Sequence, residues 1–220
     1  MKKKGEKKII FVCTGNTCRS PMAELLLKDA LRRANLKGVS VSSAGIQGRD
    51  GDVINPKSAL VLSEHGLDGD NFTSTQLKGS ALSDAFAVVC MTEKQKDILL
   101  DMRWQALRKM GGIGEEEIEN NIYSFVELTG YDVLDPYGKD VDCYRYVYGL
   151  LEAGMSALME NLRLEEYAKK PKQTPKKEGE ETPKKKRGRP KKIQTDTESA
   201  APKKKRGRPR KEKTVSLVVE

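Results

Sequence analysis

The fold is set by Ile9-Ile10-Phe11-Val12-Cys13-Thr14-Gly15-Asn16-Thr17-Cys18-Arg19-Ser20-Pro21. The four apolar residues that open it are short enough for a parallel strand that is covered on both faces. A polar turn with one glycine follows, and apolar positions resume in Met22-Ala23-Glu24-Leu25-Leu26-Leu27. Ser20 is a typical helix cap, and Pro21 fits the first helical turn. The stretch therefore predicts a buried strand, a tight loop and a helix that Ser20 caps.

Within this loop, five residues separate Cys13 from Arg19. A loop that closes onto a helix N-terminus points several backbone N–H groups, and the positive end of the helix dipole, into one concavity. A dianionic phosphate fits such a hole. Cys13 at its rim would share the field that holds the anion, which favours a nucleophilic thiolate. Arg19 carries a planar, permanent charge that can hold two phosphoryl oxygens.

The loop resembles the phosphate loop of the low-molecular-weight protein tyrosine phosphatase family, and the resemblance extends from about Ile9 to Leu164. Thr17 makes the chain most similar to the protein-arginine-phosphatase branch, because tyrosine-directed members usually have a branched aliphatic residue there. Ser43-Ala44-Gly45 is a further feature similar to this family. The resemblance implies a protein phosphatase that forms a phosphocysteine intermediate and needs no metal or other cofactor.

The resemblance also implies roles for individual loop residues. Asn16 resembles the asparagine that braces the loop, and Ser20 resembles the hydroxyl that stabilises the thiolate. Cys18 resembles the thiol with which Cys13 forms a reversible disulfide, although a small packed thiol is an open alternative. The expected phosphate-binding residues are Thr14, Gly15, Asn16, Thr17, Cys18, Arg19 and Ser20.

A second catalytic element is expected in residues 130–138, a loop punctuated by proline and glycine. It is similar to the Asp-Pro loop of the family. A carboxylic acid beside the anion could protonate the leaving group and later accept a proton from the water that hydrolyses phosphocysteine. Asp135 is the candidate, with Asp132 and Asp140 as rivals, and a simple Asp-Pro turn is the alternative interpretation.

Substrate choice is expected to depend on Thr17 and Tyr137. Thr17 is bulky at Cβ but carries a hydroxyl, which disfavours a flat phenol, and Tyr137 can stack on a phenyl ring or a guanidinium. Phosphoarginine is the predicted substrate, and phosphotyrosine is the alternative. An arsenate reductase of similar fold is also considered, but it needs a closely spaced cysteine pair downstream. Cys90 has no near neighbour of this kind, and Pro21 stands where that group tends to have glutamine.

The remaining apolar runs predict an α/β domain with a doubly wound, four-stranded parallel sheet and helices on both faces. The further strands are expected at 39–43, 85–90 and 121–126, where Ala44-Gly45 ends the first of them. The first helix should end near residues 35–38, and a second should run from about Pro56 to Gly66. We expect His65 to be structural, and Cys90 and Cys143 to belong to the core.

Composition changes abruptly after Tyr167. Residues 169–220 hold 20 of the 41 Lys and Arg but only 7 of the 32 Asp and Glu, so the net charge of +9 describes neither part of the chain. Few apolar residues are present there to offset the entropy of ordering, so the tail is expected to be disordered. The predicted organisation is a phosphatase-like domain over 1–167 and a basic tail over 168–220.

The tail contains a repeat at residues 184–192 and 203–211, and both copies resemble AT-hooks. An extended Arg-Gly-Arg-Pro core has no bulk at glycine, so it can lie deep in the narrow minor groove of A·T tracts. A generic polybasic solubility or localisation tail is the alternative. The residues expected to bind A·T-rich double-stranded DNA are Arg187, Gly188, Arg189, Pro190, Arg206, Gly207, Arg208 and Pro209.

No export signal is visible, because the apolar run behind the basic N-terminus ends at Val12 and is too short for a signal-peptide core. The sequence predicts a cytoplasmic protein with no membrane partner, and its tail predicts association with DNA in a nucleoid, or in a nucleus if the source is eukaryotic. Two function classes remain: a phosphatase acting on phosphorylated proteins near DNA, or a DNA-binding module with a non-catalytic phosphatase fold. The intact Cys13, Arg19 and Asp135 favour the enzyme.

Overall fold

The structure, a computed structural model, describes residues 6–109 and 120–167. Residues 1–5 and 110–119, and the tail with its two AT-hook-like copies, lie outside these ranges. Four strands form one parallel sheet in the order β2-β1-β3-β4, which confirms the predicted sheet. The strands are β1 (Lys7–Cys13), β2 (Val39–Gly45), β3 (Ala87–Cys90) and β4 (Ile122–Ser124).

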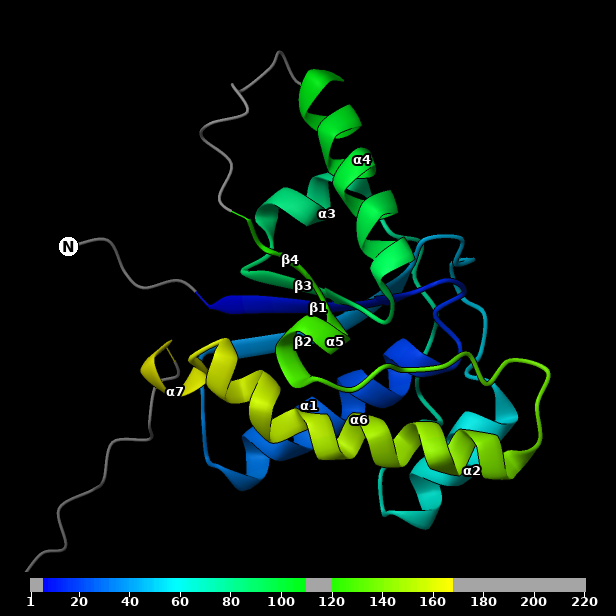
Figure 1. The fold of residues 1–220 in the computed structure, drawn as a ribbon. Helices are drawn as coiled ribbons and strands as arrows, with labels where there is room; N and C mark the ends of the chain where they lie inside the picture. The colour runs from blue at the N-terminus through cyan, green and yellow to red at the C-terminus, as the bar shows by residue number, and fades with distance from the viewer. Residues whose placement is uncertain (1–5, 110–119, 168–220) are drawn as a thin grey trace, which may run out of the picture. The chain divides into compact units, whose positions relative to one another are not determined.

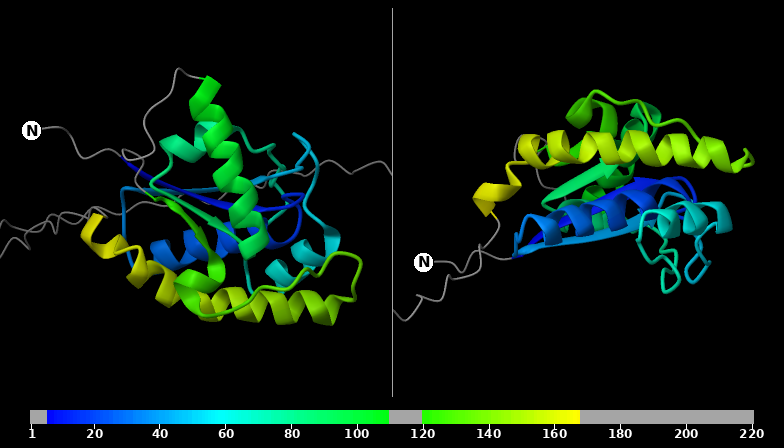
Figure 2. Two further views of the ribbon diagram at one scale, coloured as in Figure 1. Left: turned by 45° about the horizontal axis from the view of Figure 1, so that its top comes forward. Right: turned by 90° about the horizontal axis from the view of Figure 1, so that it is seen from below.

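Helices cover both faces of the sheet, as predicted (Figures 1 and 2). One face carries α1 (Arg19–Arg33) and α6 (Val141–Asn161), with α2 (Pro56–Glu64) beside them. The other face carries α3 (Gly79–Asp84) and α4 (Glu93–Lys109). Two short helices, α5 (Phe125–Thr129) and α7 (Leu164–Tyr167), complete the part that the structure describes. None of the helices in it is both long enough and apolar enough to cross a membrane.

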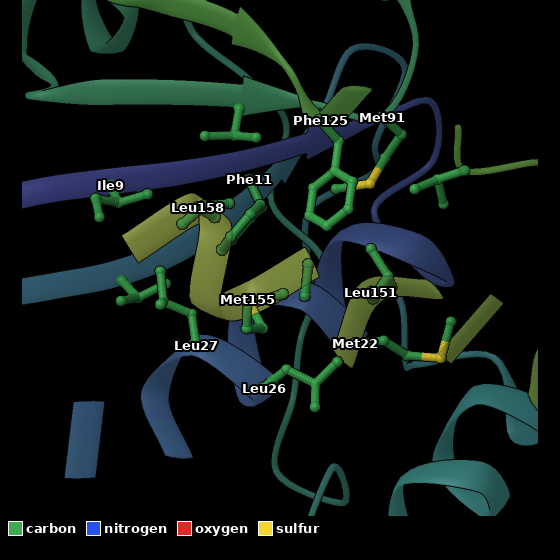
Figure 3. Close-up of a cluster of buried hydrophobic side chains, with 14 of the residues drawn as sticks. Ile9, Phe11, Met22, Leu26, Leu27, Met91, Phe125, Leu151, Met155 and Leu158 are labelled. Carbon is green, nitrogen blue, oxygen red and sulfur yellow. The ribbon is translucent and has the colours of Figure 1, made fainter. Parts of the chain in front are cut away.

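The central strand β1 is buried on both faces because its side chains alternate between two cores. Ile9 and Phe11 belong to the core beneath α1 and α6, where Figure 3 shows Phe11 among Leu27, Met155 and Leu158. Ile10 and Val12 of β1 belong to a second core with α3 and α4. Burying each large apolar side chain contributes about 1.5–3 kcal/mol, so this strand is held firmly from both sides.

The fourth strand is shorter than the sequence predicts. β4 ends at Ser124, and Phe125 and Val126, which also suit a strand, begin α5 instead. The reason is a capping box: the Ser124 hydroxyl accepts from the Glu127 N–H at 3.2 Å, and the Glu127 carboxylate accepts from the Ser124 N–H at 2.8 Å. The two capping interactions satisfy the backbone N–H groups of Ser124 and Glu127, which would need other acceptors if the strand continued.

The start of the first helix also differs from the prediction. Helix α1 begins at Arg19 after Cys18, without any side-chain cap, and Ser20 lies inside the helix. The Ser20 hydroxyl is hydrogen-bonded to the loop instead, so backbone N–H groups at this helix end remain available for an anion. The helix ends at Arg33, slightly earlier than predicted.

Three smaller differences concern strand ends and one short helix. Ala44 and Gly45 belong to β2, which was predicted to stop before them, and β3 begins only at Ala87. Helix α3 was not predicted, because Leu82 is its only buried residue and so leaves no helical period in the sequence.

Candidate active site

The loop after β1 lies at the carboxyl end of the sheet, where the strand order reverses between β1 and β3. Ligands of doubly wound sheets bind at such switch points. The end of β2 packs closely behind the loop: a Cβ on Gly45 would lie 2.9 Å from the Thr14 carbonyl oxygen, so only glycine fits. The next backbone N–H groups, of Ile46 and Gln47, donate to the carbonyls of Cys13 and Thr14 at 3.0 and 2.8 Å.

Cys13 ends β1 and is 3% exposed. Its Sγ lies 3.0 Å from the Ser20 Oγ and accepts a hydrogen bond from the Asn16 backbone N–H at 3.2 Å. The predicted nucleophile therefore lies at the beginning of a loop whose backbone turns back over the sulfur. Asn16 adopts a left-handed conformation with φ of 55°, which asparagine tolerates better than most residues and which makes this return possible.

The Asn16 side chain, fully buried, fixes the direction of the hydrogen bonds around the sulfur. Its Oδ1 accepts from the Thr75 N–H at 2.8 Å, so its amide group must face the other way. The amide donates to the hydroxyls of Ser20 at 2.9 Å and Ser43 at 2.8 Å. Since the Ser20 oxygen accepts from Asn16, its own proton is free to be donated to the Cys13 sulfur.

The same network continues to Glu24, a buried carboxylate on α1. Its Oε2 accepts the Ser43 hydroxyl at 2.6 Å, and its Oε1 pairs with Lys28. The sequence alone predicted no site role for Ser43 or Glu24. A signal was present, because Glu24 interrupts the apolar face of α1, and a buried carboxylate needs hydrogen-bonding partners.

The Asp-Pro loop brings Asp135 to the phosphate loop. The Asp135 Oδ2 accepts from the Arg19 Nη2 at 2.8 Å, and its Oδ1 accepts from the backbone N–H of Tyr137 at 3.1 Å. Arg19 is 4% exposed, whereas the Asp135 side chain is 53% exposed. Among the rivals, Asp140 is engaged as the N-cap of α6.

The Arg19 Nε is buried and has no hydrogen-bond acceptor, a condition shared by only one other buried side-chain atom in residues 6–109 and 120–167. A buried, unpaired donor on a charged group is costly. This donor lies in the loop where the sequence predicts an anion. A bound oxyanion would supply the missing acceptor.

The candidate specificity and redox residues occupy different environments. The Thr17 carbonyl accepts from the Asn55 N–H at 2.9 Å, and its Oγ1 lies 3.7 Å from the Cys18 sulfur. Burial raises the pKa of the Cys18 thiol, which also contacts the Tyr144 hydroxyl at 3.6 Å. Tyr137 is 73% exposed and lies at the surface of the Asp-Pro loop.

Two groups outside the loop are structural in their contacts. The His65 ring stacks on Tyr148 with centroids 4.0 Å apart, and its Nδ1 lies 2.9 Å from the Val61 carbonyl, as expected for a helix-end histidine. Cys90 is fully buried at the end of β3, and burial raises its pKa to about 12. Cys143, expected in the core, is only partly buried. Within the described ranges, no three His, Cys, Asp or Glu side chains are grouped as metal ligands.

Comparison with known proteins identifies the family of the domain that carries this site. The profile of the family described as low molecular weight phosphotyrosine protein phosphatase matches residues 8–169. The chain belongs to this family. It is therefore a protein phosphatase. Residues 184–196 and 203–214 match the AT hook motif, which confirms the resemblance noted in the tail.

Similar proteins in this family are named for two different substrates, phosphoarginine and phosphotyrosine. A protein-arginine-phosphatase of Geobacillus stearothermophilus is 35% identical over 159 residues, which is 72% of this chain and 98% of that protein. A probable low molecular weight protein-tyrosine-phosphatase, EpsP, of Ralstonia nicotianae is 32% identical over 71% of this chain and 97% of its own length. Among solved structures, the YwlE arginine phosphatase of Geobacillus stearothermophilus superimposes with a TM-score of 0.60 at 32% identity, covering 73% of this chain and 95% of that chain.

Proposed function

We propose that this phosphatase acts through a phosphocysteine on Cys13 and that its preferred substrate is phosphoarginine in proteins. The Cys13 thiolate attacks phosphorus, the bond from phosphorus to the guanidinium nitrogen breaks, and Asp135 donates a proton to that nitrogen. Water, deprotonated by Asp135, then attacks the phosphocysteine and releases inorganic phosphate and the thiolate. The observation that carries this proposal is the unpaired Arg19 Nε, six positions along the chain from a sulfur that faces the donors of Ser20 and Asn16.

The preference for phosphoarginine rests on Thr17. Its backbone is fixed by Asn55, and its hydroxyl makes the loop more polar than an aliphatic side chain would. The similarity to a protein-arginine-phosphatase supports this preference, but tyrosine phosphatases are almost as similar, so overall identity does not separate the two substrates. Phosphotyrosine is therefore the second candidate, and it would use the same chemistry at Cys13.

Replacing Thr17 with isoleucine is expected to shift the ratio of kcat/KM for phosphoarginine and phosphotyrosine peptides towards phosphotyrosine by about tenfold or more. The change exchanges a hydroxyl for apolar surface that suits a phenyl ring. The measurement compares both peptides on the wild type and the variant. Thr17→Ser, which keeps the hydroxyl, is the matched control and should retain the preference for phosphoarginine. A wild-type preference for phosphotyrosine would contradict the arginine assignment.

The geometry gives less support to an arsenate reductase or to a non-catalytic phosphatase fold. An arsenate reductase passes a disulfide to further cysteines, whereas Cys90 is buried and its thiol donates to the carbonyls of Thr92 and Tyr123 at 3.4 and 3.3 Å. A merely structural domain would not require a buried arginine whose Nε has no acceptor. Both Cys13 and Cys18 are free thiols in the structure, so the reversible disulfide between them stays a prediction.

We further propose that the tail holds the enzyme near A·T-rich DNA. The two AT hook matches support this, because each contains the Arg-Gly-Arg-Pro core that suits a narrow minor groove. The spacing between the hooks, 16 residues from Pro190 to Arg206, spans about 20–24 Å on average as a flexible linker. Simultaneous contact of both hooks with one duplex would then raise the affinity by avidity.

The full chain is expected to bind A·T-rich duplexes more tightly than G·C-rich ones, with affinity that falls steeply as salt rises. The variant Arg189→Ala with Arg208→Ala should reduce the A·T affinity about tenfold or more, because both arginines lie in hook cores. Lys176→Ala with Lys177→Ala removes the same charge outside the hooks and is the control that should keep the preference. Fluorescence anisotropy over a salt series measures the affinity for both duplexes. Equal binding to the A·T-rich and G·C-rich duplexes would contradict the AT-hook assignment.

A further inference from the structure

Gln95 connects helix α4 to the phosphate loop. It is the third residue of α4 and only 6% exposed. Its Nε2 donates to the Thr14 Oγ1 at 3.2 Å, and its Oε1 accepts from the Met91 backbone N–H at 3.0 Å. One amide thus bridges the turn after β3 and the residue that follows the nucleophile. The catalytic steps proposed above give this contact no role.

The hydrogen bonds of Gln95 determine the role of the Thr14 hydroxyl. The Met91 N–H is a donor, so the Gln95 oxygen must face it and the Gln95 amide group must face Thr14. The Thr14 oxygen is therefore the acceptor in this bond, and its own proton has to be donated elsewhere. No acceptor for that proton lies among the residues that the structure describes, and Thr14 is exposed on the loop.

The Thr14 backbone is held as firmly as its side chain. Its carbonyl accepts from the Gln47 N–H at 2.8 Å, so the residue is fixed from the β2 side and from the α4 side. Because this loop is the predicted anion site, a phosphoryl oxygen bound there would be an acceptor for the Thr14 hydroxyl.

We propose that Gln95 is a positioning residue that orients Thr14, so that the Thr14 hydroxyl donates a hydrogen bond to a phosphoryl oxygen of the bound substrate. This adds a side-chain donor to the backbone N–H groups of the loop. The proposal rests on phosphoryl transfer at Cys13 but is independent of the choice between phosphoarginine and phosphotyrosine.

A double-mutant cycle with Thr14→Val and Gln95→Met tests this proposal. The two probes are kcat/KM for para-nitrophenyl phosphate and the inhibition constant of tungstate, a phosphate-like oxyanion. Each single change should lower kcat/KM about tenfold and raise the inhibition constant of tungstate about tenfold. This is the effect expected from the loss of one hydrogen bond to a charged group. The double variant should be no worse than the single ones, because both remove the same bond. Thr14→Ser should restore wild-type values.

Gln105→Met is the matched control, since it makes the same substitution on an exposed side chain of α4. It should leave both probes unchanged. Gln95→Glu is a second variant that keeps an acceptor for the Met91 N–H but cannot donate to Thr14. It should also raise the inhibition constant of tungstate. Multiplied losses of about a hundredfold in the double variant, or normal tungstate inhibition of Thr14→Val, would overturn the proposal. If the wild type bound tungstate but did not hydrolyse the aryl phosphate, the catalytic proposal alone would fail.

Discussion

Replacing Cys13 with serine is expected to lower kcat/KM by at least about 10⁴-fold on every phosphorylated substrate. The serine hydroxyl is not ionised near neutral pH, and the contacts made by Ser20 and Asn16 supply donors rather than a base that could deprotonate it. The substitution changes one buried atom, so the fold should persist. Steady-state kinetics with a thermal unfolding curve measures both effects.

Cys143→Ser is the appropriate control, because Cys143 lies partly buried on α6 and has no contact with the loop cysteines in the described structure. It should retain wild-type kcat/KM. If Cys13→Ser kept more than a small fraction of the activity while remaining folded, another residue would be the nucleophile.

The second large effect is expected for Arg19→Lys, with a loss of about 10³-fold in kcat. Arg19 uses its Nη2 on Asp135 and leaves its Nε for an oxyanion, an arrangement that needs a planar group with several donors. A lysine ammonium would be a single point charge that could not contact both the carboxylate and the phosphoryl group in this geometry. Because the positive charge is retained, the loss of kcat reports the contribution of the planar guanidinium geometry rather than of charge.

The matched control is Arg32→Lys, at the exposed end of α1, where the side chain pairs with Asp29. Its kcat should not change. Steady-state kinetics and tungstate inhibition measure turnover and oxyanion binding separately. Arg19→Lys should lower kcat and also raise the inhibition constant of tungstate. A loss of less than about tenfold in both would show that Arg19 does not hold the phosphoryl group.

The strand, loop and first helix could be predicted from the sequence because they are local: the apolar run is continuous, and Cys13 and Arg19 share one loop. The predicted end of β4 was wrong because Phe125 and Val126 suit a strand as well as a helix, and only the Ser124 capping box decides between them. Serine followed three residues later by glutamate is a local signal of this box, so the sequence does contain the information that places the helix start.

The polar network around Cys13 could not be predicted in the same way. Asn16, Ser43 and Thr75 come from distant segments. The pairing of β1 with β2 brings Ser43 to the loop, and the Gly45 N–H, which donates to the Thr75 carbonyl, holds Thr75 there. The contact of the Ser20 hydroxyl with the Cys13 sulfur depends on this network, because Asn16 donates to the Ser20 oxygen. A serine before a proline indicates a cap in the local sequence, whereas tertiary contacts direct its hydroxyl to the sulfur instead.

The most direct test of phosphoryl transfer through Cys13 uses Asp135→Asn with para-nitrophenyl phosphate. This leaving group needs no proton, so the first step should proceed, whereas hydrolysis of the phosphocysteine should slow because its base is missing. Acid quenching followed by peptide mass spectrometry then locates the phosphate. We expect it on Cys13, and no enzyme-bound phosphate when Cys13→Ala is added. Phosphate on another residue, or steady turnover without any enzyme-bound phosphate, would contradict a phosphocysteine mechanism.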